Sequence, residues 1–189
     1  MRLMIMWGSS RDGRQGGVVV DWAKRRAMAD TRFEVDFIDF QDVILPFFNE
    51  PASPFSMARE GKDYTKPEGK AWAQRVAKAD AFIIVTPEYN HGYTAVLKNA
   101  LDWVGPEWVD KPVGFISYGG ISGGARTVEQ LRTVTIELGL VQVANPIHFV
   151  NFWQAFDTNG EPKEADKYNG QSDKMFAELE RLHKLFAKN

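Results

Sequence analysis

The first residues that could do chemistry form a glycine-rich segment near the N-terminus. This segment, residues 8–17, contains Ser9 and Ser10, and it adds Arg11 and Arg14 before an apolar helical pattern begins. Glycines let several backbone N–H groups point inward, serine and arginine add hydroxyl donors and charge, and a helix N-terminus adds its dipole. The combination predicts a phosphate-binding site. The alternative is an ordinary glycine-rich turn.

A second group of polar side chains follows an apolar run in the middle of the chain. Directly after Pro87, the residues Glu88, Tyr89, Asn90 and His91 supply a carboxylate, a phenol, an amide and an imidazole. Proline cannot continue a central strand, so it marks the end of this one. Such a loop can contact the edge and the face of a flat polar ring. The alternative is that Glu88 and Asn90 cap the helix that follows.

A third segment, Ser117–Gly124, has four glycines within the six positions 119–124. Glycines at this density allow the backbone itself to approach a ligand closely. The N–H groups around Gly119 and Gly120 could then bond the carbonyl and nitrogen edge of a heterocycle. The segment therefore predicts a second ligand-binding loop at the end of another apolar run.

The same segment also matches a serine nucleophile motif. Gly120–Gly124 has the pattern G-x-S-x-G between a strand and a helix, and His148 or His183 lies downstream. A serine hydrolase that uses Ser122 is therefore an alternative. We favour ligand binding, because Ser122 follows the expected strand end by about four residues, whereas such a nucleophile sits on the sharp turn itself. A hydrolase would also leave the first two loops without a role.

Short apolar runs that alternate with helical patterns must position these loops. The expected strands are Leu3–Trp7, Phe33–Phe40, Ala81–Val85, Val113–Ile116 and Val141–Ala144. Continuous apolar runs are typical of strands buried on both faces, and βαβ alternation gives parallel strands with right-handed crossovers. We therefore predict an α/β fold, a doubly wound five-stranded parallel sheet of order 2-1-3-4-5 with helices on both faces. Its ligand site should lie at the carboxyl ends of the strands.

Amphipathic helical patterns lie between and after these strands. The expected helices cover residues 18–26, 72–79, 96–104, 128–138 and 175–186. Thr65 and Glu68 form a possible capping box before the second of them. Two polar stretches, 49–66 and 154–170, are expected to be surface loops. We interpret residues 1–189 as a single domain, with a core over 1–150 and a surface loop plus C-terminal helix over 151–189.

Composition excludes several classes of function. The 23 Lys and Arg nearly balance the 25 Asp and Glu, so no strong positive field recruits nucleic acid or an anionic membrane. Cysteine is absent, which rules out disulfides, thiolate nucleophiles and Cys-ligated metal centres. The three histidines show no ligand spacing, so no metal is expected. The apolar run Leu3–Trp7 is far too short for a membrane span, and we expect a cytoplasmic protein.

Together, the loops resemble those of the flavodoxin-like NAD(P)H-dependent FMN reductases, a family that also contains chromate and quinone reductases. The similarity spans roughly residues 1–150 and rests on five strings. They are Gly8-Ser9-x-Arg11 with Gly13-Arg14-x-Gly16, Thr86–His91, Leu97–Asp102, Lys111–Gly114 and Ser117–Gly120. The string T-P-E-Y-N followed by L-K-N-A-L-D is highly specific, whereas the first loop alone is not.

The resemblance implies a role for each part of the site. The residues expected to hold the FMN phosphate are Ser9, Arg11, Arg14, Gln15 and Gly16. Those expected to line the isoalloxazine are Pro87, Glu88, Tyr89 and Asn90. Those expected to border its pyrimidine edge are Ser117, Gly119 and Gly120. No side chain is expected to act as a catalytic acid or base, because hydride transfer takes place at flavin N5.

The implied activity is an FMN-dependent, ping-pong oxidoreductase. NADPH or NADH would deliver a hydride, and a small acceptor would then take the place of the nicotinamide. That acceptor could be free flavin, a quinone, an azo compound or a metal oxyanion. A one-electron flavodoxin-type carrier and a flavin-binding regulatory module are alternatives. The family also implies a homodimer or homotetramer, with the 49–66 loop, Tyr93 and Trp108 as candidate contacts.

Overall fold

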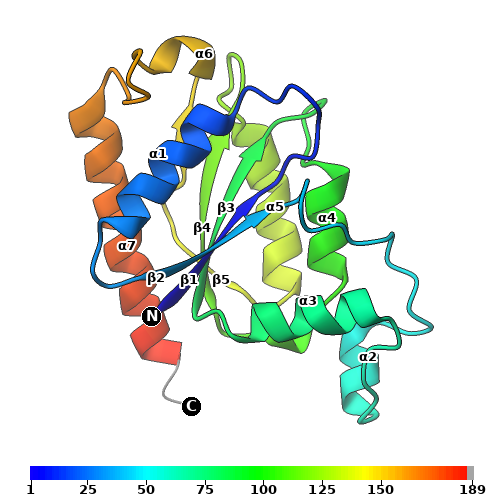
Figure 1. Cartoon of the computed structure of the whole chain (residues 1–189). Helices are drawn as coiled ribbons and strands as arrows, with labels where there is room; N and C mark the ends of the chain where they lie inside the picture. The colour runs from blue at the N-terminus through cyan, green and yellow to red at the C-terminus, as the bar shows by residue number, and fades with distance from the viewer. Residues whose placement is uncertain (187–189) are drawn as a thin grey trace.

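A parallel sheet forms the centre of the molecule (Figure 1). The computed structural model describes residues 1–186. The strands are β1 (Arg2–Trp7), β2 (Glu34–Asp39), β3 (Ala81–Pro87), β4 (Pro112–Tyr118), β5 (Val141–Gln142) and β6 (Ile147–Phe149). Their order is β2-β1-β3-β4-β5, with β6 also paired to β4. This confirms the predicted α/β class and the order 2-1-3-4-5.

Helices cover both faces of the sheet. They are α1 (Gly17–Met28), α2 (Pro54–Arg59), α3 (Pro67–Ala77), α4 (Ala95–Asp102), α5 (Ala125–Glu137), α6 (Phe152–Ala155) and α7 (Ala165–Phe186), with a 3₁₀ turn at Pro106–Trp108. Figure 1 shows α1 and α7 on one face and α3, α4 and α5 on the other. None of the helices within residues 1–186 is both long enough and apolar enough to cross a membrane.

The central strands are apolar throughout because both of their faces are covered. β3 and β4 are buried along their whole length. In β1, Leu3 and Ile5 pack toward α1 and α7, whereas Met4 and Met6 pack toward the opposite helices. Burial of each such side chain contributes about 1.5–3 kcal/mol. The sheet is therefore a rigid base whose carboxyl edge holds the loops after β1, β3 and β4.

The fifth position of the sheet differs from the prediction. The expected strand Val141–Ala144 is limited to β5, which pairs with the start of β4. After Pro146 the chain forms β6, which runs parallel to β4 and pairs with its last three residues. Proline has no N–H to give to a ladder, so a continuous strand through this position is disfavoured. The three-residue run of β6 was too short to predict.

Two segments predicted as loops contain helices. The 49–66 segment includes α2, whose N-cap is Ser53 and whose first residue is Pro54. The 154–170 segment overlaps α6 and the beginning of α7, which starts at Ala165 rather than near Met175. Serine followed by proline is a common helix start, but a helix as short as α2 leaves too little periodicity to detect.

The predicted capping box before α3 is wrong. The N-cap is Lys66, and its side chain makes no capping bond. Thr65 instead donates its hydroxyl and its backbone N–H to the buried carboxylate of Glu50, which also accepts the N–H of Lys66. A buried carboxylate needs such donors. Glu50 therefore anchors the end of the 49–66 segment to its beginning.

Candidate functional site

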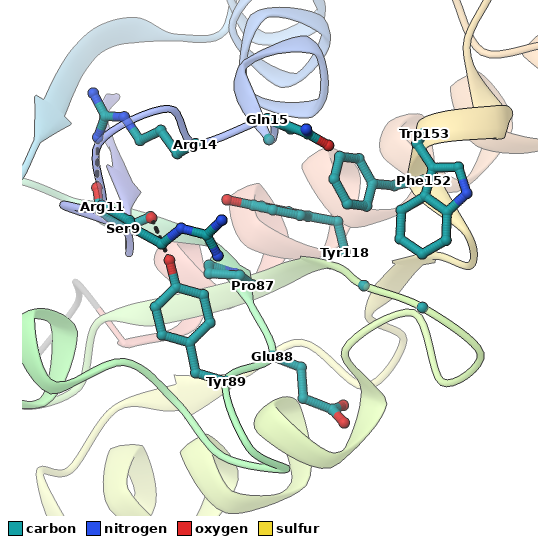
Figure 2. A pocket seen from close by; sticks show the side chains of 13 residues that line it. Ser9, Arg11, Arg14, Gln15, Pro87, Glu88, Tyr89, Tyr118, Phe152 and Trp153 are labelled. Carbon is teal, nitrogen blue, oxygen red and sulfur yellow. Dashed lines mark hydrogen bonds between the residues drawn. The ribbon is translucent and has the colours of Figure 1, made fainter.

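The loops after β1, β3 and β4 surround a cavity of about 250 Å³ (Figure 2). Its lining residues are Ser9, Arg11, Arg14, Gln15, Gly16, Pro87, Glu88, Tyr89, Tyr118, Gly119, Gly120, Phe152 and Trp153. Ten of the twelve predicted site residues are in this set, and the two that are not are Asn90 and Ser117. The three loops therefore meet at one place, as parallel strand ends require.

Unpaired backbone amides line the first loop. No N–H from Ser10 to Gly17 has a hydrogen-bond acceptor within residues 1–186. The loop leads directly into α1, whose N-terminal dipole favours an anion. Most backbone N–H groups in proteins are paired, so a row of free ones is unusual. Successive free N–H groups form the concave donor sites that bind anions such as phosphate. The first loop therefore has the donor set of a phosphate site.

The Arg14 guanidinium makes its contacts within the protein. Its guanidinium donates to the Asp39 carboxylate at 2.6 Å and to the carbonyl of Ser9, and it lies 3.6 Å from the centre of the Trp7 ring. Burial alone would raise the pKa of Asp39, but the hydrogen bonds from Arg14 and the Gln41 N–H, together with the charges of Arg14 and Lys24, hold that pKa below its usual value. Arg14 therefore lines the cavity but is held at the junction of β1 and β2, and its predicted phosphate contact stays a prediction.

Arg11 is the cation that extends into the cavity. Its guanidinium lies between Tyr89 and Tyr118 in Figure 2, whereas that of Arg14 points away from both rings. Within the described chain, Arg11 forms no ion pair with a carboxylate. A free guanidinium beside unpaired amides can bind a phosphate through two parallel hydrogen bonds. Arg11 therefore lies where it could contact a phosphate, and its predicted role stays a prediction.

The second loop is a tight turn. Tyr89 and Gly92 form an antiparallel bridge, and Asn90 and His91 between them have φ values of 50° and 67°. Asparagine tolerates this left-handed backbone, which explains its place in the turn. Asn90 is exposed and does not line the cavity. Tyr89 does face inward, with its hydroxyl 3.0 Å from that of Ser9.

Glu88 joins the second loop to the third. Its carboxylate accepts hydrogen bonds from the Ser122 hydroxyl at 2.8 Å and from Arg126 at 2.7 Å. Burial alone would raise the pKa of Glu88, but these hydrogen bonds together with the charge of Arg126 bring the pKa below its usual value. The helix-capping alternative is wrong, because α4 is capped by Thr94. Glu88 instead positions the loop that holds Gly119 and Gly120.

Tyr118, which was not predicted as a site residue, lines the cavity, whereas the predicted Ser117 does not. Successive residues of a strand point to opposite faces. Ser117 is buried toward α5, where its hydroxyl contacts the Gly123 carbonyl at 2.8 Å and His148 Nδ1 at 2.7 Å. Tyr118 points to the α1 face and lines the cavity. The alternation of side chains between the two faces of β4 was the signal that could have identified Tyr118 as a cavity residue.

The arrangement gives no support to the hydrolase alternative. Ser122 hydrogen bonds to the Glu88 carboxylate, and within residues 1–186 it has no histidine partner. His148 contacts Ser117 instead, and burial lowers the pKa of its imidazole. A nucleophilic serine needs a base within hydrogen-bond reach. Ser122 therefore acts as a link between loops.

Aromatic residues of α6 form one wall of the cavity. The Tyr118 and Phe152 rings lie 5.1 Å apart, and those of Phe152 and Trp153 lie 5.4 Å apart. The N–H of Phe152 donates to the carbonyl of Gly119, so α6 is tied to the third loop. Trp153 was a candidate for a substrate pocket or a subunit contact from its loop context, whereas Phe152 lies beyond the quoted strings and was not predicted. Trp153 is 56% exposed, whereas Trp108 is fully buried in the core.

The side chains and backbone around the cavity fit FMN. Unpaired amides and Arg11 can hold a phosphate, Pro87 and Tyr89 present flat surfaces, and the Gly119–Gly120 backbone can approach a ring edge. The described residues contain no cluster of three or more metal-ligating side chains.

The known proteins that are similar to this chain are described as FMN reductases and quinone reductases. The family described as NADPH-dependent FMN reductase matches residues 1–155. An NAD(P)H-dependent FMN reductase of Schizosaccharomyces pombe is 39% identical over 134 residues, which are 70% of this chain and 64% of that protein. An NAD(P)H:quinone oxidoreductase of Solanum tuberosum is 32% identical over 136 residues, 69% of this chain and 66% of that protein. This chain thus spans less than two thirds of those two relatives.

Two further proteins extend the comparison. A 2-hydroxy-1,4-benzoquinone reductase of a Burkholderia species is 33% identical over 144 residues, 71% of each protein. Among solved structures, a flavoenzyme NAD(P)H:(acceptor) oxidoreductase from Paracoccus denitrificans superimposes with a TM-score of 0.70 at 21% identity. That superposition covers 99% of this chain and 97% of the other, and it supports the flavodoxin-like fold.

Proposed function

Because this chain belongs to the NADPH-dependent FMN reductase family, we propose that its cavity binds FMN and transfers a hydride from NADPH or NADH to a small acceptor. The observation that carries the proposal is the row of unpaired N–H groups from Ser10 to Gly17. FMN, when bound, supplies the hydride chemistry, and the protein supplies binding and orientation. Reduced nicotinamides are cytoplasmic metabolites, so we infer that the protein works in the cytoplasm.

Each loop would serve a different part of the cofactor. The Ser10–Gly17 amides and Arg11 would hold the phosphate, while Ser9 would contact it or the adjoining chain. Pro87 and Tyr89 would support the ring. The Gly119 N–H already donates to the Phe149 carbonyl, so the Gly120 N–H would be the donor to the pyrimidine edge, where negative charge increases on reduction. Water is kept from the buried end of the site by Tyr118, which is only 3% exposed.

A planar quinone is the acceptor that the open side of the cavity favours. Phe152 and the exposed Trp153 give this side an aromatic surface, onto which a flat ring can stack. Relatives named as quinone reductases agree with this choice. Free flavin and azo compounds are flat as well. A metal oxyanion would gain nothing from the aromatic wall.

Steady-state assays with protein reconstituted with FMN test the proposal. We expect NADPH or NADH oxidation that depends on added benzoquinone, and a higher kcat/KM for benzoquinone than for chromate. Trp153→Ala should raise the KM for benzoquinone and leave that for ferricyanide nearly unchanged. Tightly bound FMN without NAD(P)H oxidation would contradict the reductase and favour a one-electron carrier or a regulatory module.

We further propose that copies of this chain assemble into a dimer or tetramer. Trp108 is buried in the core and cannot be the contact that was expected of it. Ile44 and Phe47 are instead 79% and 80% exposed, just before the 49–66 segment. Two large apolar side chains exposed this close together in the sequence are candidates for a contact between copies.

A further inference from the structure

The hydroxyl of Tyr118 occupies an unusual position in the cavity. Its residue is only 3% exposed, yet it lines the cavity. The Trp7 indole N–H donates to Tyr118 Oη at 2.8 Å. An indole nitrogen can only donate, so the tyrosine oxygen must be the acceptor in this pair. The hydroxyl proton of Tyr118 therefore has to be directed elsewhere.

No group of the described chain accepts that proton. The bond from Trp7 is the one hydrogen bond that Tyr118 Oη makes within residues 1–186. Burial raises the pKa of Tyr118, so the proton stays on the oxygen at all physiological pH values. A buried hydroxyl whose proton is not used costs free energy. The protein thus keeps a fixed, protonated donor at the cavity wall without a partner of its own.

The donor lies at the phosphate end of the cavity. A Cβ added to Gly16 would lie 2.3 Å from Tyr118 Oη, so the hydroxyl rests directly against this glycine. Gly16 is the N-cap residue of α1 and belongs to the loop with unpaired N–H groups. In Figure 2, the Arg11 guanidinium extends toward the same hydroxyl. Three kinds of donor therefore converge: backbone amides, a guanidinium and a phenol.

We propose that Tyr118 is a phosphate-binding residue that donates its hydroxyl proton to the phosphate of bound FMN. This inference rests on the proposed function, since it assigns one donor within that site. The role of Trp7 is then positioning: its N–H occupies the acceptor side of Tyr118 and leaves only the donor side for the ligand. Neither residue was predicted as part of the site.

Affinity measurements on two variants test the assignment. Tyr118→Phe removes the hydroxyl, whereas Trp7→Phe removes the same internal hydrogen bond but keeps the hydroxyl and an aromatic ring under Arg14. FMN and riboflavin are titrated into each protein, and the dissociation constants are read from the quenching of flavin fluorescence. Riboflavin lacks the phosphate, so it reports ring binding alone. Thermal unfolding establishes that each variant is folded.

We expect Tyr118→Phe to weaken FMN binding about tenfold or more, as for a hydrogen bond to a charged group, and riboflavin binding less than about twofold. Trp7→Phe should weaken FMN binding less than about threefold. Equal losses for FMN and riboflavin in Tyr118→Phe would overturn the assignment, because the hydroxyl would then serve the ring. Equal losses of FMN affinity in the two variants would also overturn it, because only the internal bond would matter.

A measurement on the unmodified protein keeps the test decisive if Tyr118→Phe does not fold. The Tyr118 hydroxyl proton should give an NMR resonance with a through-bond coupling to the ³¹P of bound FMN. A protein that binds FMN without this coupling contradicts the role of Tyr118 and leaves the proposed function intact. A protein that binds neither flavin contradicts the proposed function itself.

Discussion

Arg11 and Arg14 lie on one loop but have different surroundings. Arg14 is held by Asp39 and Trp7, whereas Arg11 faces the cavity without a carboxylate partner in the described chain. We expect Arg11→Ala to weaken FMN binding about tenfold without loss of stability, because a charged hydrogen bond is worth about 1.5–3 kcal/mol. Arg14→Ala should instead lower the free energy of unfolding by about 2 kcal/mol. Flavin titration and urea unfolding measure the two effects, and the reverse pattern would refute the assignment.

The lowered pKa of Glu88 makes a prediction about acid stability. Hydrogen bonds from Arg126 and Ser122 lower this pKa in the folded protein, despite burial. The charged carboxylate therefore stabilises the fold above its unfolded pKa of about 4.3, and this contribution is lost as the pH falls through the lower folded value. The stability difference between the wild type and Glu88→Gln should thus be full at pH 6 and shrink toward pH 3. Urea unfolding across this range measures it, and a constant difference would contradict the ion pair.

At the scale of elements, the junction between the first loop and α1 depends on close contact. A Cβ on Gly16 would lie 2.1 Å from Tyr118 Cζ, whereas one on Gly17 would meet nothing closer than 3.8 Å. We expect Gly16→Ala to lower the free energy of unfolding by about 1–3 kcal/mol and to impair FMN binding. Gly17→Ala is the matched control, and it should be neutral or slightly stabilising because it restricts the unfolded chain. Similar unfolding curves for the two variants would show that the Tyr118 ring does not pack on Gly16.

The positions of the three loops were predictable from the sequence, whereas the directions of individual side chains were less so. The buried strands β1, β3 and β4 predict the three loops, since the ends of parallel strands share one edge. Which side chains face the cavity depends on strand phase and turn geometry, and this is where Ser117 and Asn90 were misplaced. The aromatic wall of Phe152 and Trp153 comes from α6, whose four residues are too few for a periodic signal.

For the whole molecule, the exposed apolar side chains before α2 predict self-association. Phe47 is 80% exposed and Ile44 is 79% exposed, so burial of both against a second copy would stabilise an assembly. We expect Phe47→Asp to shift the protein toward a monomer at low micromolar concentration. Light scattering after size exclusion gives the mass, and Met28→Asp, at an exposed residue on α1, is the control. A wild-type protein that is monomeric at high concentration would contradict the assembly.

The central proposal is that a single cavity binds a phosphorylated flavin. Titration of the purified protein with FMN and with riboflavin, followed by flavin fluorescence, measures this property without any assumption about the acceptor. We expect saturation at about one FMN per chain with a dissociation constant of about 1 μM or lower, and binding of riboflavin at least about tenfold weaker. Equal affinities for the two flavins, or no saturable binding of either, would contradict the phosphate cradle on which the site is built.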